Sequence, residues 1–205
     1  MFIKHNHLKN TYDLKECKFL GEGHNGAVYR FSNGDAIKIS YNPKDFICEY
    51  RILEKVNGNK YFPIIREIGE DYMIRECVEG TLLSKYIKKY GLKKSLAIEI
   101  INMLKEFDKL RFKKIDIRCR DVFVEQDGSL KIIDPQKCYS KDRYFPRHLS
   151  KGLYKLGVLD YFLKVLKEYD IILFKRWNKE INFYVRCLSK KRVDVHLNGV
   201  LKGMS

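Results

Sequence analysis

The chain has 205 residues, of which 45% are hydrophobic, so it is long enough to bury a core as one domain or two small lobes. This composition excludes a disordered tail. Lysine and arginine total 41 against 26 acidic residues, and the resulting net charge of +15 favours anionic partners.

The basic excess is confined to one part of the chain. Residues 1–80 carry 12 basic and 12 acidic side chains, whereas residues 81–205 carry 29 and 14. Two lobes with different functions would give such an uneven charge distribution. A general enrichment of lysine on solvated surfaces would give it as well.

The six cysteines form no Cys-x-x-Cys pair, and the five histidines do not cluster with them. This pattern argues against a zinc site and against a disulfide framework. No apolar run resembles a signal peptide or approaches the roughly 18 apolar residues of a membrane span. We therefore expect a reduced, cytoplasmic protein with no membrane partner.

The first elements are strands around a glycine-rich loop at residues 20–27. Asn33-Gly34 lies between two β-rich runs and predicts a tight hairpin, because a type I′ turn needs positive φ at both central positions. In a dinucleotide-binding fold the glycines would end a strand and open a helix. Here the chain continues as a strand, which excludes that fold.

A helix is predicted over residues 43–56. Asn42 can cap it, and Pro43 takes the first helical position, where its missing N–H costs nothing. Glu49 falls on the same stripe as apolar residues such as Leu53. A carboxylate on a buried stripe needs a cationic partner.

The remaining elements alternate between strands and helices. The pattern predicts two strands between residues 64 and 76, a connector at 77–80, a helix over 81–90 ending at Gly91, and a longer helix spanning 96–107. Strands at 121–124 and 130–133 flank the Asp127-Gly128 hairpin, Asp134 follows the second strand directly, and from residue 151 the chain is mostly helical.

Taken in order, these segments resemble the protein-kinase fold. Gly21-x-Gly23-x-x-Gly26-x-Val28 is similar to the kinase glycine-rich loop, and Ala36-Ile37-Lys38 is similar to its strand lysine motif. The other matching segments are the helix glutamate Glu49, the last strand and hinge at 72–80 with Arg75 at the gatekeeper position, the catalytic loop from Asp116 to Asp121, and the metal-binding motif from Ile132 to Gln136.

The resemblance implies an α+β, bilobal protein-kinase-like fold. Its N-lobe, residues 1–78, would be an antiparallel sheet with one helix, and its C-lobe, residues 79–205, would be small and mainly helical. It also implies a set of site residues. Asp116, Lys38 and Glu49 would be catalytic, ATP would be bound by Gly21, Gly23, Gly26, Val28, Ala36, Lys38, Glu76 and Val78, and Mg²⁺, or Mn²⁺, would be held by Asp121 and Asp134.

The sequence also departs from the kinase pattern. Lys114 and Ile115 replace the usual histidine and arginine, Asp121 replaces an asparagine, and Pro135-Gln136 replaces Phe-Gly. No Ala-Pro-Glu motif follows, as in the atypical RIO kinases. Arg75 is large and charged, so it either narrows the nucleotide pocket or pairs with an acid.

Three functions are compatible with these features. The first is an ATP- and magnesium-dependent phosphotransferase acting on Ser/Thr of a protein or of itself. The second is a nucleotide-binding pseudokinase or ATPase-type regulator that docks RNA, a ribosomal particle or an acidic protein through Arg118, Arg120, Arg143 and Arg147. The third, a small-molecule kinase related to aminoglycoside or choline phosphotransferases, is opposed by the basic charge of the C-lobe.

Overall fold

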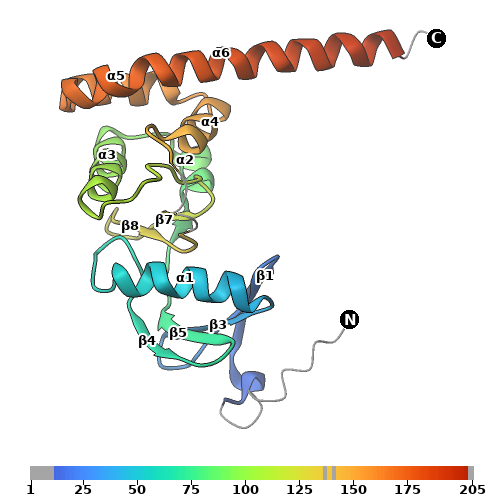
Figure 1. The fold of residues 1–205 in the computed structure, drawn as a ribbon, viewed down its shortest axis with the longest axis vertical. Helices are drawn as coiled ribbons and strands as arrows, with labels where there is room; N and C mark the ends of the chain where they lie inside the picture. The colour runs from blue at the N-terminus through green and yellow to red at the C-terminus, as the bar shows by residue number, and fades with distance from the viewer. Residues whose placement is uncertain (1–11, 136–137, 140–141, 203–205) are drawn as a thin grey trace. The chain divides into compact units, whose positions relative to one another are not determined.

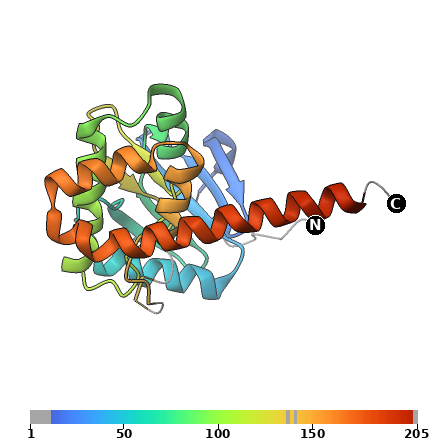
Figure 2. The same ribbon diagram turned by 90° about the horizontal axis from the view of Figure 1, so that it is seen from above.

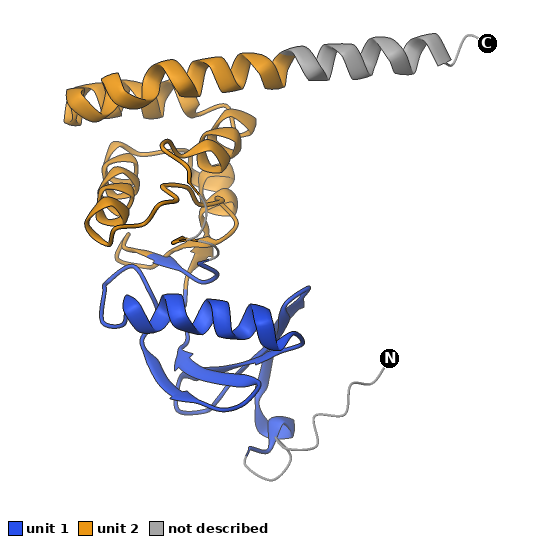
Figure 3. Ribbon diagram, in the orientation of Figure 1, with its two compact units in different colours: residues 1–79, 131–136 blue, residues 80–130, 137–205 orange. Residues whose placement is uncertain are grey.

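The structure is a computed structural model that describes residues 12–135, 138–139 and 142–202, with side chains through residue 189. It confirms the α+β class, with a five-stranded antiparallel sheet and six α-helices in the described part. The chain divides into two compact units (Figure 3). Unit 1 contains the described residues up to 79 together with 131–135, and unit 2 contains 80–130 and the described residues from 138 onwards.

The sheet of unit 1 has the order β1-β2-β3-β5-β4, and each neighbouring pair is antiparallel (Figure 1). The strands are β1 (Lys18–Gly23), β2 (Gly26–Arg30), β3 (Asp35–Ser40), β4 (Ile65–Ile68) and β5 (Tyr72–Glu76).

The glycine-rich segment forms the β1–β2 hairpin, with Gly23 opposite Gly26. The predicted turn at Asn33-Gly34 joins β2 to β3, where Gly34 has φ +92° and its N–H donates to Phe31 O at 3.2 Å. The hairpin is therefore confirmed at the predicted position, but the predicted type I′ turn is wrong: Gly34 has positive φ and Asn33 does not, and the hydrogen bond from Gly34 N–H to Phe31 O makes Ser32 and Asn33 the central residues. The exclusion of a strand-to-helix dinucleotide loop is confirmed as well.

Strand β3 is buried on both faces, and its alternation separates two environments. Ile37 and Ile39 form a cluster with Ile74 of β5, and this cluster is covered by half-buried side chains that include Tyr12 and Leu14. Leu14 belongs to a short 3-10 helix, Leu14–Glu16. Because strand side chains alternate, Lys38 points to the opposite face of the sheet, where α1 packs.

Helix α1 (Pro43–Lys55) starts at the predicted residue and ends one residue before the predicted end at residue 56. Asn42 Oδ1 accepts the N–H of Lys44 at 2.9 Å, which is the expected cap. Leu53 is fully buried and Glu49 lies on the same buried stripe.

A small sheet has the order β6-β7-β8 and is formed by β6 (Thr81–Leu82), β7 (Val122–Val124) and β8 (Leu130–Ile132). The strands β6 and β7 and Leu130 of β8 belong to unit 2. The predicted helix over 81–90 is wrong in its first two residues, since Thr81 pairs with Val124 and α2 spans Leu83–Tyr90. Gly80 permits this pairing, because a Cβ there would lie 2.3 Å from Val124 O. Gly91 N–H donates to Ile87 O at 2.8 Å and closes the helix as predicted.

Four longer helices complete unit 2: α3 (Lys94–Lys109), α4 (Arg147–Lys155), α5 (Leu159–Tyr169) and α6 (Ile171–Lys202). The helices α5 and α6 lie side by side (Figure 2). Trp177 of α6 is fully buried and its Nε1–H donates to Tyr144 O at 2.9 Å. In the described residues, no helix combines the length and apolar character needed to cross a membrane.

Residues 131–135 group with unit 1, whereas the sequence places them in the second lobe. Three polar contacts to unit 1 account for this grouping. Ile132 N–H donates to Tyr61 O at 2.8 Å, Lys131 Nζ pairs with Glu76 at 2.8 Å, and Ile133 O accepts from Arg75 at 2.9 Å. The segment that carries Asp134 is therefore fixed to the sheet of unit 1.

Candidate functional site

Lys38 and Glu49 form a buried ion pair in unit 1. Lys38 Nζ donates to Glu49 Oε2, and the two side chains are only 11% and 7% exposed. The pair joins the middle strand of the sheet to the buried stripe of α1. The sequence predicts these two residues as partners, and the structure brings them together.

Arg75 is the third charged group of this cluster. It lies on β5 opposite Ala36, its side chain is 6% exposed, and its Nη1 lies 3.5 Å from Glu49 Oε1. The same nitrogen donates to Ile133 O at 2.9 Å. Of the two alternatives given for Arg75, the structure shows pairing with an acid.

The cluster therefore contains two cations and one carboxylate, so its formal charge is positive. Buried charges are tolerated when they are paired and hydrogen-bonded, and Glu49 satisfies both cations at once. Arg75 also anchors the backbone directly before Asp134, which is half-buried. The lysine, the helix glutamate and the segment carrying Asp134 thus belong to one hydrogen-bonded network.

The three loop glycines have different local roles. A Cβ at Gly21 or Gly23 would meet nothing within 4 Å, whereas a Cβ at Gly26 would lie 2.0 Å from Ile39 O. The close approach of β2 to β3 thus requires a glycine at position 26, independently of the nucleotide-binding role predicted for it. Val28, also assigned to nucleotide binding, lies opposite Lys38 in the β2–β3 register.

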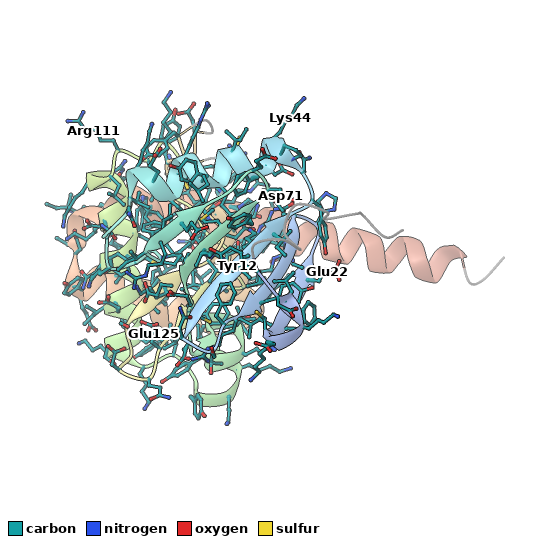
Figure 4. All side chains as sticks on the ribbon, turned by 90° about the horizontal axis from the view of Figure 1, so that it is seen from below. Tyr12, Glu22, Lys44, Asp71, Arg111 and Glu125 are labelled. Carbon is teal, nitrogen blue, oxygen red and sulfur yellow. The ribbon has the colours of Figure 1, made fainter. Side chains whose placement is uncertain are left out.

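The hairpin is tied to the end of β3 by a side-chain contact. Tyr41 OH donates to Glu22 Oε1, and this hydrogen bond raises the pKa of Tyr41 to about 12. Glu22 lies in the loop-bearing strand β1 and is labelled in Figure 4. The contact restrains the hairpin that carries Gly21 and Gly23.

The remaining predicted nucleotide-binding residues of unit 1 lie on β3, on β5 and in the segment after it. Ala36 is 3% exposed and Val78 is half-buried. Glu76 Oε2 accepts the N–H of Ile64 at 3.2 Å as well as pairing with Lys131. Its carboxylate is therefore engaged, and its backbone N–H donates to Ile64 O at 2.9 Å.

Asp116 lies in unit 2, and its side chain is completely buried. Its Oδ1 accepts from His148 N at 2.7 Å and from Leu149 N at 3.3 Å, while its Oδ2 contacts His148 Nδ1 at 2.5 Å. The N-cap residue of α4 is Pro146, whose side chain has no acceptor. Asp116 supplies that acceptor from a distant part of the chain.

His148 is a residue that sequence reasoning missed. Its side chain is 37% exposed and lies beside the segment that resembles the catalytic loop, since Asp116 binds it directly. The following residue also contacts this segment, because Cys119 Sγ lies 3.9 Å from Leu149 O. Pro146 signals a helix start, but no local pattern pairs His148 with an aspartate 32 residues away.

The two predicted metal ligands lie in different units. Asp134 is in unit 1, whereas Asp121 is in unit 2, half-buried, with its N–H donating to Arg118 O at 2.9 Å and its Oδ1 3.9 Å from Arg120 Nε. Within the described residues, no three His, Cys, Asp or Glu side chains gather as a metal site.

The four arginines predicted to dock an anionic partner fall into two groups. Arg118 and Arg120 are exposed, whereas Arg143 and Arg147 are half-buried. The Arg147 guanidinium lies 4.7 Å from the centre of the Tyr184 ring. Arg143 N–H donates to the backbone of residue 113 at 2.9 Å. Gln136 of the predicted metal motif lies outside the described residues.

Comparison with known proteins gives limited similarity. No family model matches the chain. A Bacillus subtilis (strain 168) protein named "Putative serine/threonine-protein kinase YrzF" is 21% identical over 126 residues, which are 58% of this chain and 59% of that protein. An uncharacterized protein of Dictyostelium discoideum is 33% identical over 72 residues, 35% of this chain and 8% of that protein. The chain thus spans less than two thirds of the length of either relative.

Proposed function

We propose that this protein is an ATP- and magnesium-dependent phosphotransferase with a bilobal, protein-kinase-like fold that transfers the γ-phosphate to Ser/Thr of a protein or of itself. The observation that carries the proposal is the buried Lys38–Glu49 ion pair between β3 and α1, in the sheet that also holds the glycine-rich hairpin. The similarity to a protein named as a serine/threonine kinase supports the same reading.

Phosphoryl transfer depends mainly on positioning and charge stabilisation, so the proposed roles follow from the charges of unit 1. Lys38 would contact the α- and β-phosphates, and Glu49 fixes its position. Arg75 leaves the buried cluster with a net positive charge, which favours a bound polyanion. Gly21 and Gly23 have open space where a side chain would stand, which suits a loop that covers phosphates.

Magnesium fits the donor chemistry of the chain. Carboxylate oxygens are the ligands that Mg²⁺ prefers, and it is commonly held by one or two carboxylates together with substrate phosphates. Asp134 and Asp121 would provide those carboxylates. The ion would neutralise charge that develops on the transferred phosphoryl group.

The test compares radiolabel transfer from [γ-³²P]ATP by wild type, Lys38→Ala, Asp134→Ala and Lys44→Ala. Lys44 is exposed in the first turn of α1 (Figure 4) and serves as the matched control for removal of a lysine. We expect labelled protein from wild type and Lys44→Ala, and a loss of at least about 100-fold in the other two. Equal labelling by all four proteins, or none by wild type, contradicts the proposal.

A second candidate function is a nucleotide-binding regulator without transferase activity. The observation that favours it is the complete burial of Asp116, the predicted catalytic carboxylate. Exposed Arg118 and Arg120 would then dock RNA, a ribosomal particle or an acidic protein. This function predicts ATP binding without label transfer, together with salt-sensitive partner binding that is weakened by Arg118→Glu and Arg120→Glu.

A further inference from the structure

We propose that His148 accepts the proton of the phosphoryl acceptor and that Asp116 is the residue that positions it. This inference rests on the proposed phosphotransferase function and reassigns one of its roles. Two contacts within unit 2 hold Asp116 and His148 together: Asp116 Oδ1 accepts from His148 N at 2.7 Å, and Oδ2 contacts His148 Nδ1 at 2.5 Å. Asp116 Oδ1 also accepts from Leu149 N at 3.3 Å.

The hydrogen-bond pattern assigns the tautomer of His148. An ionised carboxylate can only accept, so the Nδ1 atom facing Asp116 Oδ2 must carry the hydrogen. In the neutral ring Nε2 then carries the lone pair. Among the described residues, no side chain or backbone group forms a hydrogen bond with Nε2 of His148.

Asp116 and His148 differ in the solvent exposure of their side chains. The Asp116 side chain is 0% exposed, whereas the His148 side chain is 37% exposed. A substrate hydroxyl cannot reach a carboxylate whose oxygens are buried and already accept three donors. The imidazole of His148 is partly exposed and is fixed to the loop that the kinase resemblance assigns to the acceptor, so the proton transfer is assigned to this ring.

The proposed step moves one phosphoryl group and one proton. As the acceptor oxygen forms its bond to the γ-phosphorus of ATP, the bond from that phosphorus to the bridging oxygen of ADP breaks. The hydroxyl proton passes to Nε2 of His148, and ADP leaves with the electron pair of the broken bond. Asp116 does not take the proton; it orients the ring and stabilises the imidazolium that forms.

If His148 has a purely structural role, its replacement has a different effect, so the structural role and the proton-accepting role can be distinguished by experiment. His148→Asn places an amide nitrogen near the position of Nδ1 and can still donate to Asp116, but it has no second ring nitrogen. Lys155→Asn, exposed in the last turn of the same helix, controls for an asparagine substitution in α4. Thermal unfolding and ATP binding are measured for each protein alongside label transfer.

We expect His148→Asn to keep the wild-type unfolding temperature and ATP affinity, while kcat falls by about 10²- to 10⁴-fold with little change in KM. Added imidazole should restore part of the activity of His148→Gly. We also expect the Nδ1–H proton of wild type to give a downfield NMR resonance that is absent from Asp116→Asn.

The outcomes distinguish the inference from the function on which it rests. Active wild type with an equally active His148→Asn overturns the inference alone and leaves His148 as a structural partner of Asp116. Inactive wild type overturns the proposed function, and the proton-acceptor role falls with it. Lost activity without imidazole rescue, accompanied by a lowered unfolding temperature, also overturns the inference.

Discussion

The buried cluster of Lys38, Glu49 and Arg75 makes a quantitative prediction about stability. Glu49→Gln removes the carboxylate that both cations share and leaves two buried positive charges without a counter-ion. Removing one partner of a buried ion pair typically costs about 3–5 kcal/mol. The exposed Glu54→Gln on the same helix should change the free energy of unfolding by less than about 0.5 kcal/mol.

Arg75→Met should cost less, because Glu49 keeps Lys38 as its partner. The loss is a hydrogen bond to Ile133 O and one ionic contact, for which about 1–3 kcal/mol is expected. In the double variant the repulsion between the two cations disappears. Its destabilisation should therefore fall short of the sum of the single effects by at least about 1 kcal/mol.

Urea unfolding followed by circular dichroism measures the free energies of unfolding of wild type and the four variants under one set of conditions. A Glu49→Gln variant that loses less than about 1 kcal/mol would contradict the assignment of a shared buried carboxylate. Strict additivity in the double variant would show that Glu49 and Arg75 do not interact, and would refute the role given to Arg75.

Three further predictions concern other parts of the chain. Gly26→Ala should destabilise the protein by about 1–3 kcal/mol because its Cβ would overlap a backbone oxygen of β3, whereas Gly23→Ala has open space and should be neutral in the same unfolding assay. Burial raises the pKa of the Cys119 thiol to about 12, so iodoacetamide at pH 8 should alkylate it only after unfolding, as mass spectrometry would show; rapid native alkylation contradicts this burial. The hydrogen bond from Lys105 lowers the pKa of Asp170, so the stability that Asp170 contributes is complete at neutral pH and is lost as pH falls below about 4; Asp170→Asn should flatten that acid dependence, and an unchanged pH profile would count against the pair.

The part of the site within unit 1 was predictable because two periodicities determine it. Alternation along β3 places Lys38 on one face of the sheet and the apolar residues Ile37 and Ile39 on the other face. The helical periodicity of α1 places Glu49 on the buried face of that helix. A buried carboxylate and a buried lysine on facing elements then have an obvious reason to pair. The hydrogen bond from Arg75 to Ile133 O was not predictable, because Ile133 lies 58 residues further along the chain.

The surroundings of Asp116 were beyond sequence reasoning for a similar reason. Capping motifs are recognised when the acceptor lies at the start of its own helix, whereas Pro146 leaves α4 without one and the acceptor comes from another segment. The strand at Thr81–Leu82 was missed because two residues carry no periodicity. Its formation depends on the pairing of Thr81 with Val124 and of Leu82 with Phe123, which lie 43 and 41 residues further along the chain.

In the proposed function, Lys38 contacts the phosphates of bound ATP. The most direct test is an acyl-phosphate derivative of ATP, which acylates a lysine that lies beside the bound phosphates, with the modified residue identified by mass spectrometry. We predict selective modification of Lys38 that excess ATP and Mg²⁺ suppress and that exposed Lys44 does not share. Modification spread over exposed lysines, without protection by ATP, would contradict the proposed nucleotide site.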